Sequence, residues 1–329
     1  MGIGRRGLTA FAAAGLAAAV AGLIARSRPV TGIVSLVLAV GSPYAATLSV
    51  LAVLIAVYLR HVVLSVVAVA VAAASLGVQF VWYHGGHPSD VGPDVQIRVL
   101  SSNLRNGEAD AVSFVKLAED QADVVMVAEL TPQAAQNFSR LGISRTFPYA
   151  VLMPEAGAVG IGMWSRFPLV AVPVPKRRSI ATPAARLRIP GLRFDPLFAA
   201  VHVDSPVAAG SDNIAEWHSG MAGVQAQLDR FSALAGRGAV IVGGDFNSTP
   251  DMRQFRDLLT GGYADAANRA GAGFAPTFPA AGWLPPMITI DHVLTRNAAV
   301  SRITTVAIHG SDHRGLLTTI RVPLTPRRA

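Results

Sequence analysis

The first 89 residues of this 329-residue chain contain no acidic side chain, and three long apolar runs dominate them. A helix needs roughly 20 mainly apolar residues to cross the hydrocarbon core of a bilayer. The middle run contains Gly41, Ser42 and Pro43, so it predicts one kinked or offset span rather than two. The sequence therefore predicts a membrane region over residues 1–83 with about three transmembrane helices, in the runs at 8–25, 30–59 and 62–83.

The basic residues of this region predict its orientation. Arg5 and Arg6 precede the first run and Arg60 lies between the second and third, and together they outweigh Arg26 and Arg28 on the other side. Because Lys and Arg are enriched in cytoplasmic loops, the N-terminus is expected in the cytoplasm. Three spans then place the rest of the chain outside it. We expect a multi-pass protein of the cell membrane whose large C-terminal domain is extracytoplasmic.

A cleaved export signal is the competing interpretation of the N-terminus. Arg5 and Arg6 followed by a short apolar core resemble a twin-arginine signal. Two further uncharged runs and a poor cleavage site after Ile24 favour membrane spans instead.

The overall charge says little about the substrate. The chain carries a formal net charge of +8, of which five positive charges lie in the acid-free region and flank apolar segments rather than line a groove. The absence of cysteine excludes disulfides, thiolate metal sites and a cysteine nucleophile.

The pattern changes after a linker rich in Gly and Pro at residues 84–95. Short apolar runs typical of strands then alternate with amphipathic stretches typical of helices. This predicts an α/β or α+β domain over residues 96–325. The expected strands lie at 96–101, 124–128, 197–202 and 239–243, and the expected helices at 109–121 and 216–235.

Several of the expected strands end on polar side chains that can carry chemistry. An apolar strand stops at two glycines and delivers Asp245 and Asn247, which should point to the same side because side chains alternate on an extended chain. A carboxylate can deprotonate a water and an amide can hold a phosphate oxygen. The same pair could instead cap a turn before Pro250.

Three further segments add to this set. One apolar strand finishes on Glu129, a hard-oxygen ligand suited to Mg²⁺ or Ca²⁺, although the acid could also stabilise a following helix. Asp291 is expected inside an apolar strand, where an ionised carboxylate is costly unless paired. Asp312 and His313 lie in a loop bounded by glycines, and a buried Asp could orient such a His.

These segments match, in order, the motif series of a known enzyme family. The chain resembles the endonuclease/exonuclease/phosphatase superfamily, which includes deoxyribonucleases, exonuclease III-like endonucleases, sphingomyelinases and inositol polyphosphate 5-phosphatases. The matching segments are residues 101–105, 128–129, 160–169, 201–202, 244–247, 290–292 and 311–313. The resemblance implies a four-layer sandwich of two mostly antiparallel β-sheets flanked by helices.

The resemblance also implies roles for individual residues. Glu129, Asn103 and Asp312 would form the metal site, which is expected to take Mg²⁺, with Mn²⁺ or Ca²⁺ as alternatives. Asp245 would activate the attacking water. The phosphate would be contacted by Asn247, His202 and Arg105, and His313 backed by Asp291 would stabilise or protonate it. His292 is expected to be structural.

The implied activity is hydrolysis of a phosphodiester by in-line attack of water, as in a nuclease or a phospholipid phosphodiesterase. The alternatives are a catalytically inactive binding domain of the same fold and a phosphomonoesterase. A calcineurin-like metallophosphatase is disfavoured because its Gly-Asn-His motif is missing. DNA, RNA and a phospholipid headgroup all stay open as substrates, although residues 176–178 form a basic cluster that could contact DNA. The lipid bilayer is the other expected partner, and no obligate protein partner is evident.

Overall fold

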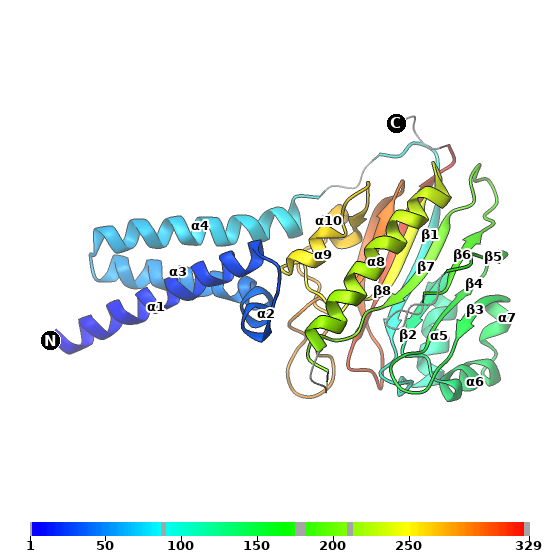
Figure 1. Ribbon diagram of the computed structural model, residues 1–329, viewed down its shortest axis with the longest axis horizontal. Helices are drawn as coiled ribbons and strands as arrows, with labels where there is room; N and C mark the ends of the chain where they lie inside the picture. Colours follow the sequence, from blue (N-terminus) through cyan, green and yellow to red (C-terminus); the bar gives the residue numbers. More distant parts are fainter. Residues whose placement is uncertain (1, 87–89, 175–181, 209–212, 326–329) are drawn as a thin grey trace. The chain divides into compact units, whose positions relative to one another are not determined.

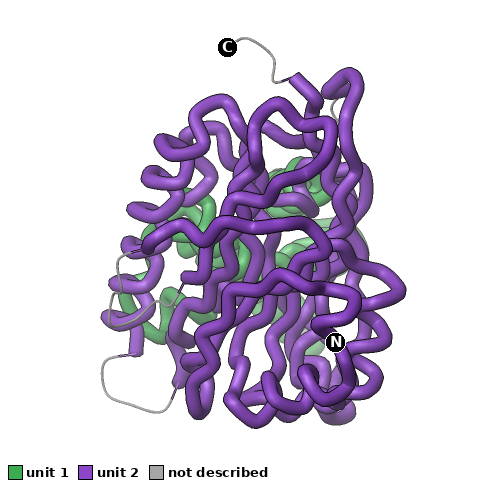
Figure 2. Tube along the Cα trace, turned by 90° about the vertical axis from the view of Figure 1, so that its right-hand side faces the viewer, with its two compact units in different colours: residues 1–85, 249–257 green, residues 86–248, 258–329 purple. Residues whose placement is uncertain are grey.

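The computed structural model describes residues 2–86, 90–174, 182–208 and 213–325 and contains two compact units (Figures 1 and 2). One unit comprises the chain up to Gly85 together with Thr249–Asp257. The other comprises Gly86–Ser248 and the chain from Leu258 onward. The basic cluster at residues 176–178 lies outside the described residues.

The first unit is helical, and two of its helices are long and apolar enough to cross a membrane. A further pair of helices forms a third candidate span, but it bends by 63° at Gly41, where the sequence predicts a kink. Small side chains such as Ala12, Ala52 and Ala68 are buried where the helices pack, which allows close approach of their backbones. The helices are α1 (Gly2–Ser27), α2 (Ile33–Val40), α3 (Ser42–Tyr58), α4 (Val62–His84) and the short α9 (Arg253–Asp257).

A buried carboxylate joins the short segment Thr249–Asp257 to the long helices of this unit. The Oδ1 atom of Asp251 accepts hydrogen bonds from Arg26 Nε at 2.8 Å and from Gln79 Nε2 at 2.9 Å. Burial raises the pKa of Asp251, although Gln79 and Arg26 both oppose this effect. Gln254 adds two hydrogen bonds to the backbone of Val30. The segment is therefore held to the helices by polar contacts that the hydropathy pattern does not reveal.

The second unit contains two six-stranded sheets. The first has the order β11-β12-β1-β2-β4-β3 and the second the order β5-β6-β7-β8-β10-β9. The strands of the first sheet are β1 (Asp94–Asn103), β2 (Val124–Ala128), β3 (Tyr149–Met153), β4 (Ile161–Ser165), β11 (Ala299–Ala307) and β12 (Arg314–Pro323). Those of the second are β5 (Leu169–Ala171), β6 (Ala184–Leu187), β7 (Leu197–His202), β8 (Val240–Asp245), β9 (Ala264–Asp265) and β10 (Asp291–Arg296).

The two sheets pack face to face and helices cover their outer faces, so the expected four-layer sandwich is confirmed (Figure 1). The inner core draws on both sheets, with Val99 and Met126 from one and Phe198 and Ile241 from the other. Phe114, Phe138 and other apolar side chains fill the space between the first sheet and its helices. The helices are α5 (Ala111–Gln121), α6 (Pro132–Arg140), α7 (Ile143–Thr146), α8 (Asn213–Ala235), which lies over the second sheet, and α10 (Ala266–Ala270).

Each sheet contains a single pair of parallel strands within the described part of the chain, and the two pairs occupy equivalent places. In the first sheet β1 runs parallel to β2, with Asn103 opposite Ala128. In the second sheet β7 runs parallel to β8, with His202 opposite Asp245. Because parallel strands end at the same edge of a sheet, polar residues at these ends are brought side by side.

Gly244 explains how the strand before Asp245 can approach its neighbour. Its φ of +152° lies in a region that side chains with a Cβ rarely adopt, and a Cβ there would collide with the carbonyl oxygen of Val201. The glycine therefore lets β8 lie against β7 directly beside Asp245.

We predict that Asp251→Ala destabilises the helical unit. The Asp251 and Arg26 side chains are only 2% and 15% exposed, and breaking a buried ion pair commonly costs about 3–5 kcal/mol. The Tm of the full chain in detergent should fall by roughly 5–10 °C. Asp257→Ala is the matched control, because Asp257 pairs with Arg253 on the same short helix but is 61% exposed. Equal melting shifts in the two variants would contradict a structural role for Asp251.

Candidate active site

The carboxyl ends of the parallel strands bring polar side chains from both sheets together. Asn103 ends β1 and Glu129 directly follows β2, whereas His202 and Asp245 end β7 and β8. Asp291 begins β10 and lies opposite Asp245 in the antiparallel register. Asp291 lies in a strand, as the sequence pattern predicts, but it is the first residue of β10 rather than an interior one, because the strand pairing begins at Asp291 itself.

The side-chain amide of Asn103 bridges the two sheets. Its Nδ2 atom donates to Glu129 Oε1 at 2.9 Å and to Asp245 Oδ2 at 3.0 Å. Its Oδ1 atom accepts from the backbone N–H of Arg105 at 2.8 Å. Asn103 is 1% exposed, so the two carboxylates are held together in a desolvated environment.

Strained backbone positions surround this bridge. Four of the six non-glycine residues with positive φ among the described residues lie here: Arg105, Asn106, Glu129 and Asn247, with φ between 45° and 59°. Such conformations are unfavourable for residues with a Cβ and persist where the surroundings fix them, often at functional sites. At Glu129 the fixing contact is a 2.5 Å hydrogen bond from the Asn106 N–H to Oε2.

His202 faces the same two carboxylates. Its Nε2 atom lies 3.8 Å from Glu129 Oε1 and 3.8 Å from Asp245 Oδ2. On the opposite side of the ring, Nδ1 lies 2.9 Å from the carbonyl oxygen of Ala158. A carbonyl oxygen only accepts, so Nδ1 carries a proton and Nε2 is directed into the site.

Asp291 and His313 form a buried pair beside Asp245. Asp291 Oδ2 lies 2.8 Å from His313 Nδ1, and His313 Nε2 lies 3.7 Å from Asp245 Oδ2. Burial alone would lower the pKa of His313, but the charges of Asp291 and Asp245 raise this pKa to about 10. His313 is therefore an imidazolium at neutral pH, with both ring nitrogens acting as donors.

Asp245 is 1% exposed, and its pKa is raised first by burial and then by the charge of Asp291, while His313 and His202 lower it. Its Oδ1 atom accepts from the Asn247 N–H at 2.8 Å. The expectation of an extended chain from Asp245 to Asn247 does not hold. Asn247 has a φ of +45°, and its side chain donates to the carbonyl oxygen of Val203 at 2.8 Å.

The side chains of two other predicted site residues, Arg105 and Asp312, make no hydrogen bond or ion pair with the cluster. The Arg105 side chain pairs with Glu108 at 3.2 Å and is half exposed. Among the described residues, the Asp312 carboxylate has no hydrogen bond or ion pair, although its charge helps to raise the pKa of His313. His292 points away from the cluster, as expected for a structural residue, and bridges Asp265 Oδ2 and the carbonyl oxygen of Ser248, each at 2.9 Å.

The charges of this cluster suit a divalent cation. Glu129, Asp245 and Asp291 contribute three carboxylates, which one imidazolium, His313, does not balance. One oxygen of Asp291, Oδ1, is buried without a hydrogen-bond partner among the described residues. Ligand atoms of Asp245, Asp291 and His313 lie within 4.8 Å of one another, and His313 can bind a metal ion only through a nitrogen that has lost its proton. Carboxylate oxygens, including those of Glu129, are the donors that a hard cation such as Mg²⁺ prefers.

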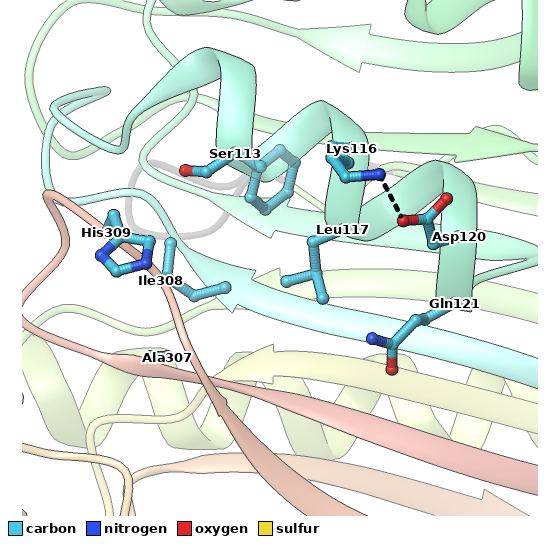
Figure 3. A pocket seen from close by; sticks show the side chains of 9 residues that line it. Ser113, Lys116, Leu117, Asp120, Gln121, Ala307, Ile308 and His309 are labelled. Atoms are coloured by element: carbon cyan, nitrogen blue, oxygen red, sulfur yellow. Dashed lines mark hydrogen bonds and ion pairs between the residues drawn. The ribbon is translucent and has the colours of Figure 1, made fainter.

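A shallow cavity of about 280 Å³ lies elsewhere on the second unit, between α5 and the residues that follow β11 (Figure 3). Its charged groups, Lys116 and Asp120, pair with each other at 3.1 Å. None of the residues that line it belongs to the cluster, so this cavity is not the candidate site.

Sequence reasoning missed three residues that support the cluster, namely Ala158, Thr277 and Phe278. Ala158 orients His202 through its carbonyl oxygen, and Thr277 Oγ1 accepts from the Asp291 N–H at 3.3 Å. The ring of Phe278 lies 4.9 Å from that of His313. A weak signal exists only for Thr277 and Phe278, since both lie within the uncharged stretch 271–290 that leads to Asp291.

Comparisons with known proteins agree with this geometry. A family model described as the Endonuclease/Exonuclease/phosphatase family matches residues 87–313. A comparison with curated proteins gives no match. Among solved structures, an endonuclease/exonuclease/phosphatase family protein from Bacteroides thetaiotaomicron is 14% identical with a TM-score of 0.52, covering 70% of this chain and 99% of its own.

Two further structures have the same fold. One from Beutenbergia cavernae, described as an endonuclease/exonuclease/phosphatase, is 18% identical with a TM-score of 0.51 and covers 69% of this chain and 72% of its own. D. rerio TDP2, solved in complex with a single-strand DNA product, is 16% identical with a TM-score of 0.53 and covers 69% of this chain and 99% of its own.

We predict that Asp291→Asn lowers the pKa of His313 from about 10 toward the ordinary histidine value of about 6.5. The pKa of His313 is higher in the folded protein than in the unfolded chain, so the Asp291–His313 pair stabilises the folded state. This stabilisation is complete below about pH 6.5 and is lost as pH rises through about 10. Histidine NMR titration, with His313→Gln for assignment, measures the shift. An unchanged His313 pKa in Asp291→Asn would contradict the pairing.

Proposed function

The chain belongs to the endonuclease/exonuclease/phosphatase family, and on this premise we propose that it is a metal-dependent phosphodiesterase that uses an activated water. One observation carries the proposal. The hydrogen-bonded row of Glu129, Asn103 and Asp245 lies beside the Asp291–His313 pair. Together these residues supply a base, a cation site and a positively charged donor within one cluster. In-line attack on a phosphate needs all three.

Asp245 is the proposed base. The causes that raise its pKa also make its carboxylate a stronger acceptor for the proton of an attacking water. The water oxygen forms a bond to phosphorus while the ester P–O bond breaks, and no covalent intermediate with the protein is required. His313 directs its Nε2 proton toward the same region as Asp245 Oδ2, so it can stabilise or protonate a phosphate oxygen.

Asn247 and His202 are the proposed phosphate contacts, and Arg105 is a third. His202 has its Nδ1 proton fixed by Ala158, so it donates to a phosphate oxygen when Nε2 is also protonated. Arg105 would exchange its exposed partner Glu108 for the substrate, which costs little because exposed ion pairs are weak.

A divalent cation, Mg²⁺ or alternatively Mn²⁺ or Ca²⁺, would be held by Glu129 with Asn103 and Asp312. A bound cation acts as a Lewis acid on the phosphate. For Asn103 to act as a ligand, its amide must present Oδ1 rather than Nδ2 to the cation side, since Oδ1 here accepts from the Arg105 N–H.

The proposed setting is the cell membrane, with α1, α4 and the bent pair α2 and α3 as spans and the catalytic unit outside the cytoplasm. A nucleic acid and a phospholipid headgroup both supply the required phosphodiester. D. rerio TDP2, solved with a DNA product, has a similar structure. This likeness does not select nucleic acid as the substrate of this chain, because 16% identity indicates a shared fold alone.

Removal of divalent cations should abolish hydrolysis. The expected result for the full chain is loss of activity on bis-p-nitrophenyl phosphate in excess EDTA and recovery with Mg²⁺ or Mn²⁺. EDTA already saturated with Mg²⁺ is the control for effects of the chelator itself. Full activity in excess free EDTA would refute the metal assignment.

Asp245→Asn should lower turnover by about 10²–10⁴-fold while leaving the fold intact, because it removes the base but keeps the shape of the side chain. Asp265→Asn is the matched control. Asp265 is likewise a buried carboxylate bonded to a histidine, His292, but that histidine points away from the cluster. Turnover above about a third of wild type in Asp245→Asn would mean that Asp245 is not the base.

A further inference from the structure

An uncharged loop next to the candidate active site exposes large apolar side chains. Residues 271–290 contain no Asp, Glu, Lys, Arg or His and connect α10 to β10. Near the middle of this stretch Trp283 is 90% exposed and Leu284 is 41% exposed. Trp283 has the most exposed side chain among the large apolar residues that the structure describes. Exposed apolar groups that cluster on one loop usually indicate a binding surface.

The base of this loop is firmly held. Phe278 and Ile288 pair as in a hairpin, with hydrogen bonds in both directions at 2.9 Å. The intervening residues 279–287, here called the tip loop, project from this pair and include Trp283 and Leu284. The pair is formed by backbone contacts, so the tip loop does not depend on its own side chains for its position.

The same base lies against the catalytic cluster. The Phe278 ring is 4.9 Å from that of His313. The Ala280 N–H donates to the carbonyl oxygen of Asp312 at 2.6 Å, and the Arg314 N–H donates to that of Thr277 at 2.8 Å. A molecule that binds the tip loop therefore comes close to the residues on either side of His313.

We propose that the tip loop inserts into the surface of a lipid bilayer and that the substrate is a lipid phosphodiester headgroup. The second part rests on the phosphodiesterase function proposed above. Tryptophan is enriched at the boundary between headgroups and acyl chains, where its ring is buried and its N–H stays hydrated. Exposed leucine adds apolar area, and an uncharged loop carries no ion that must be desolvated.

The backbone of the tip loop also suits a bilayer surface. Pro279, Pro285 and Pro286 have no N–H group, so fewer backbone donors lose their hydration on insertion. Nucleic acid is a poorer match, because binding to its phosphates relies on Lys and Arg, and the loop has neither. The apolar helices of the same chain, long enough to span a membrane, would keep this loop near a bilayer at high local concentration.

Fluorescence quenching in proteoliposomes tests the contact with lipid. The full chain and its Trp283→Phe variant are reconstituted in phosphatidylcholine with or without brominated acyl chains. The difference between the two proteins isolates Trp283 from the other three tryptophans, including Trp82 in α4. We expect this difference signal to be quenched by bromolipid and shielded from acrylamide. A Trp283 signal quenched by acrylamide and unaffected by bromolipid would overturn the proposal.

Activity measurements test the substrate class. The double variant Trp283→Ser, Leu284→Ser should hydrolyse phospholipid in the vesicles roughly tenfold more slowly or worse, because it loses its apolar anchor. Its turnover of soluble bis-p-nitrophenyl phosphate should stay within about twofold of wild type, since no cluster residue is changed. Val112→Ser is the control, because it removes a 63% exposed apolar side chain from α5 and should leave both activities unchanged.

The outcomes separate this proposal from the proposed function. An equal loss on lipid and soluble substrate, or a loss confined to a single-stranded DNA oligonucleotide, would overturn the lipid assignment and indicate base stacking in the second case. If wild type hydrolyses none of these substrates, the phosphodiesterase function and the lipid substrate fail together, and the quenching result still decides whether Trp283 contacts the bilayer.

Discussion

The candidate active site depends on one side-chain amide that joins two sheets. Asn103 Nδ2 donates to a carboxylate from its own sheet, Glu129, and to one from the facing sheet, Asp245. Without a shared donor, two desolvated carboxylates would repel each other across the sandwich. Sheet packing alone fixes the distance between the layers, but this bridge fixes how the two strand edges are aligned. His202, Asp291 and His313 are all arranged around it.

The site stores both electrostatic and conformational strain. Glu129 and Asn247 hold left-handed backbone conformations, and a carboxylate oxygen of Asp291 lies buried without a hydrogen-bond partner among the described residues. The extended apolar core between the sheets makes these costs tolerable, because it keeps the strand ends in place. Rigid strands thus hold these residues in conformations and environments that cost free energy. The same residues in a flexible loop would move to more favourable ones.

The sequence predicted the strand ends well and the loop geometry poorly. The expected strands at 124–128 and 197–202 end where β2 and β7 do, because hydrophobic burial enforces the apolar pattern. Those expected at 96–101 and 239–243 stop two residues short of Asn103 and Asp245, which end β1 and β8. The alternation rule failed at Asn247 because it applies only to extended backbone, and the left-handed turn there leaves no clear mark on the pattern. The sandwich of two sheets followed from the resemblance to a family, not from periodicity.

Contacts made by backbone groups could not be predicted either. The carbonyl oxygen of Ala158 that orients His202 has no residue-type signal, since every residue has a carbonyl group. Asn103 was expected at the metal site, but the direction in which its amide points was not predicted, and here its nitrogen faces the carboxylates. That choice depends on the surrounding donors and acceptors, which are known only once the chain has folded.

The discontinuous helical unit has a consequence for biosynthesis. Arg26 and Gln79 leave the ribosome early, but their shared acceptor, Asp251, follows only after four of the six strands of each sheet have been made. Domains generally fold as they emerge, N-terminal parts first. The helices must therefore wait with two unpaired polar groups, and translation beyond Asp251 is what completes them.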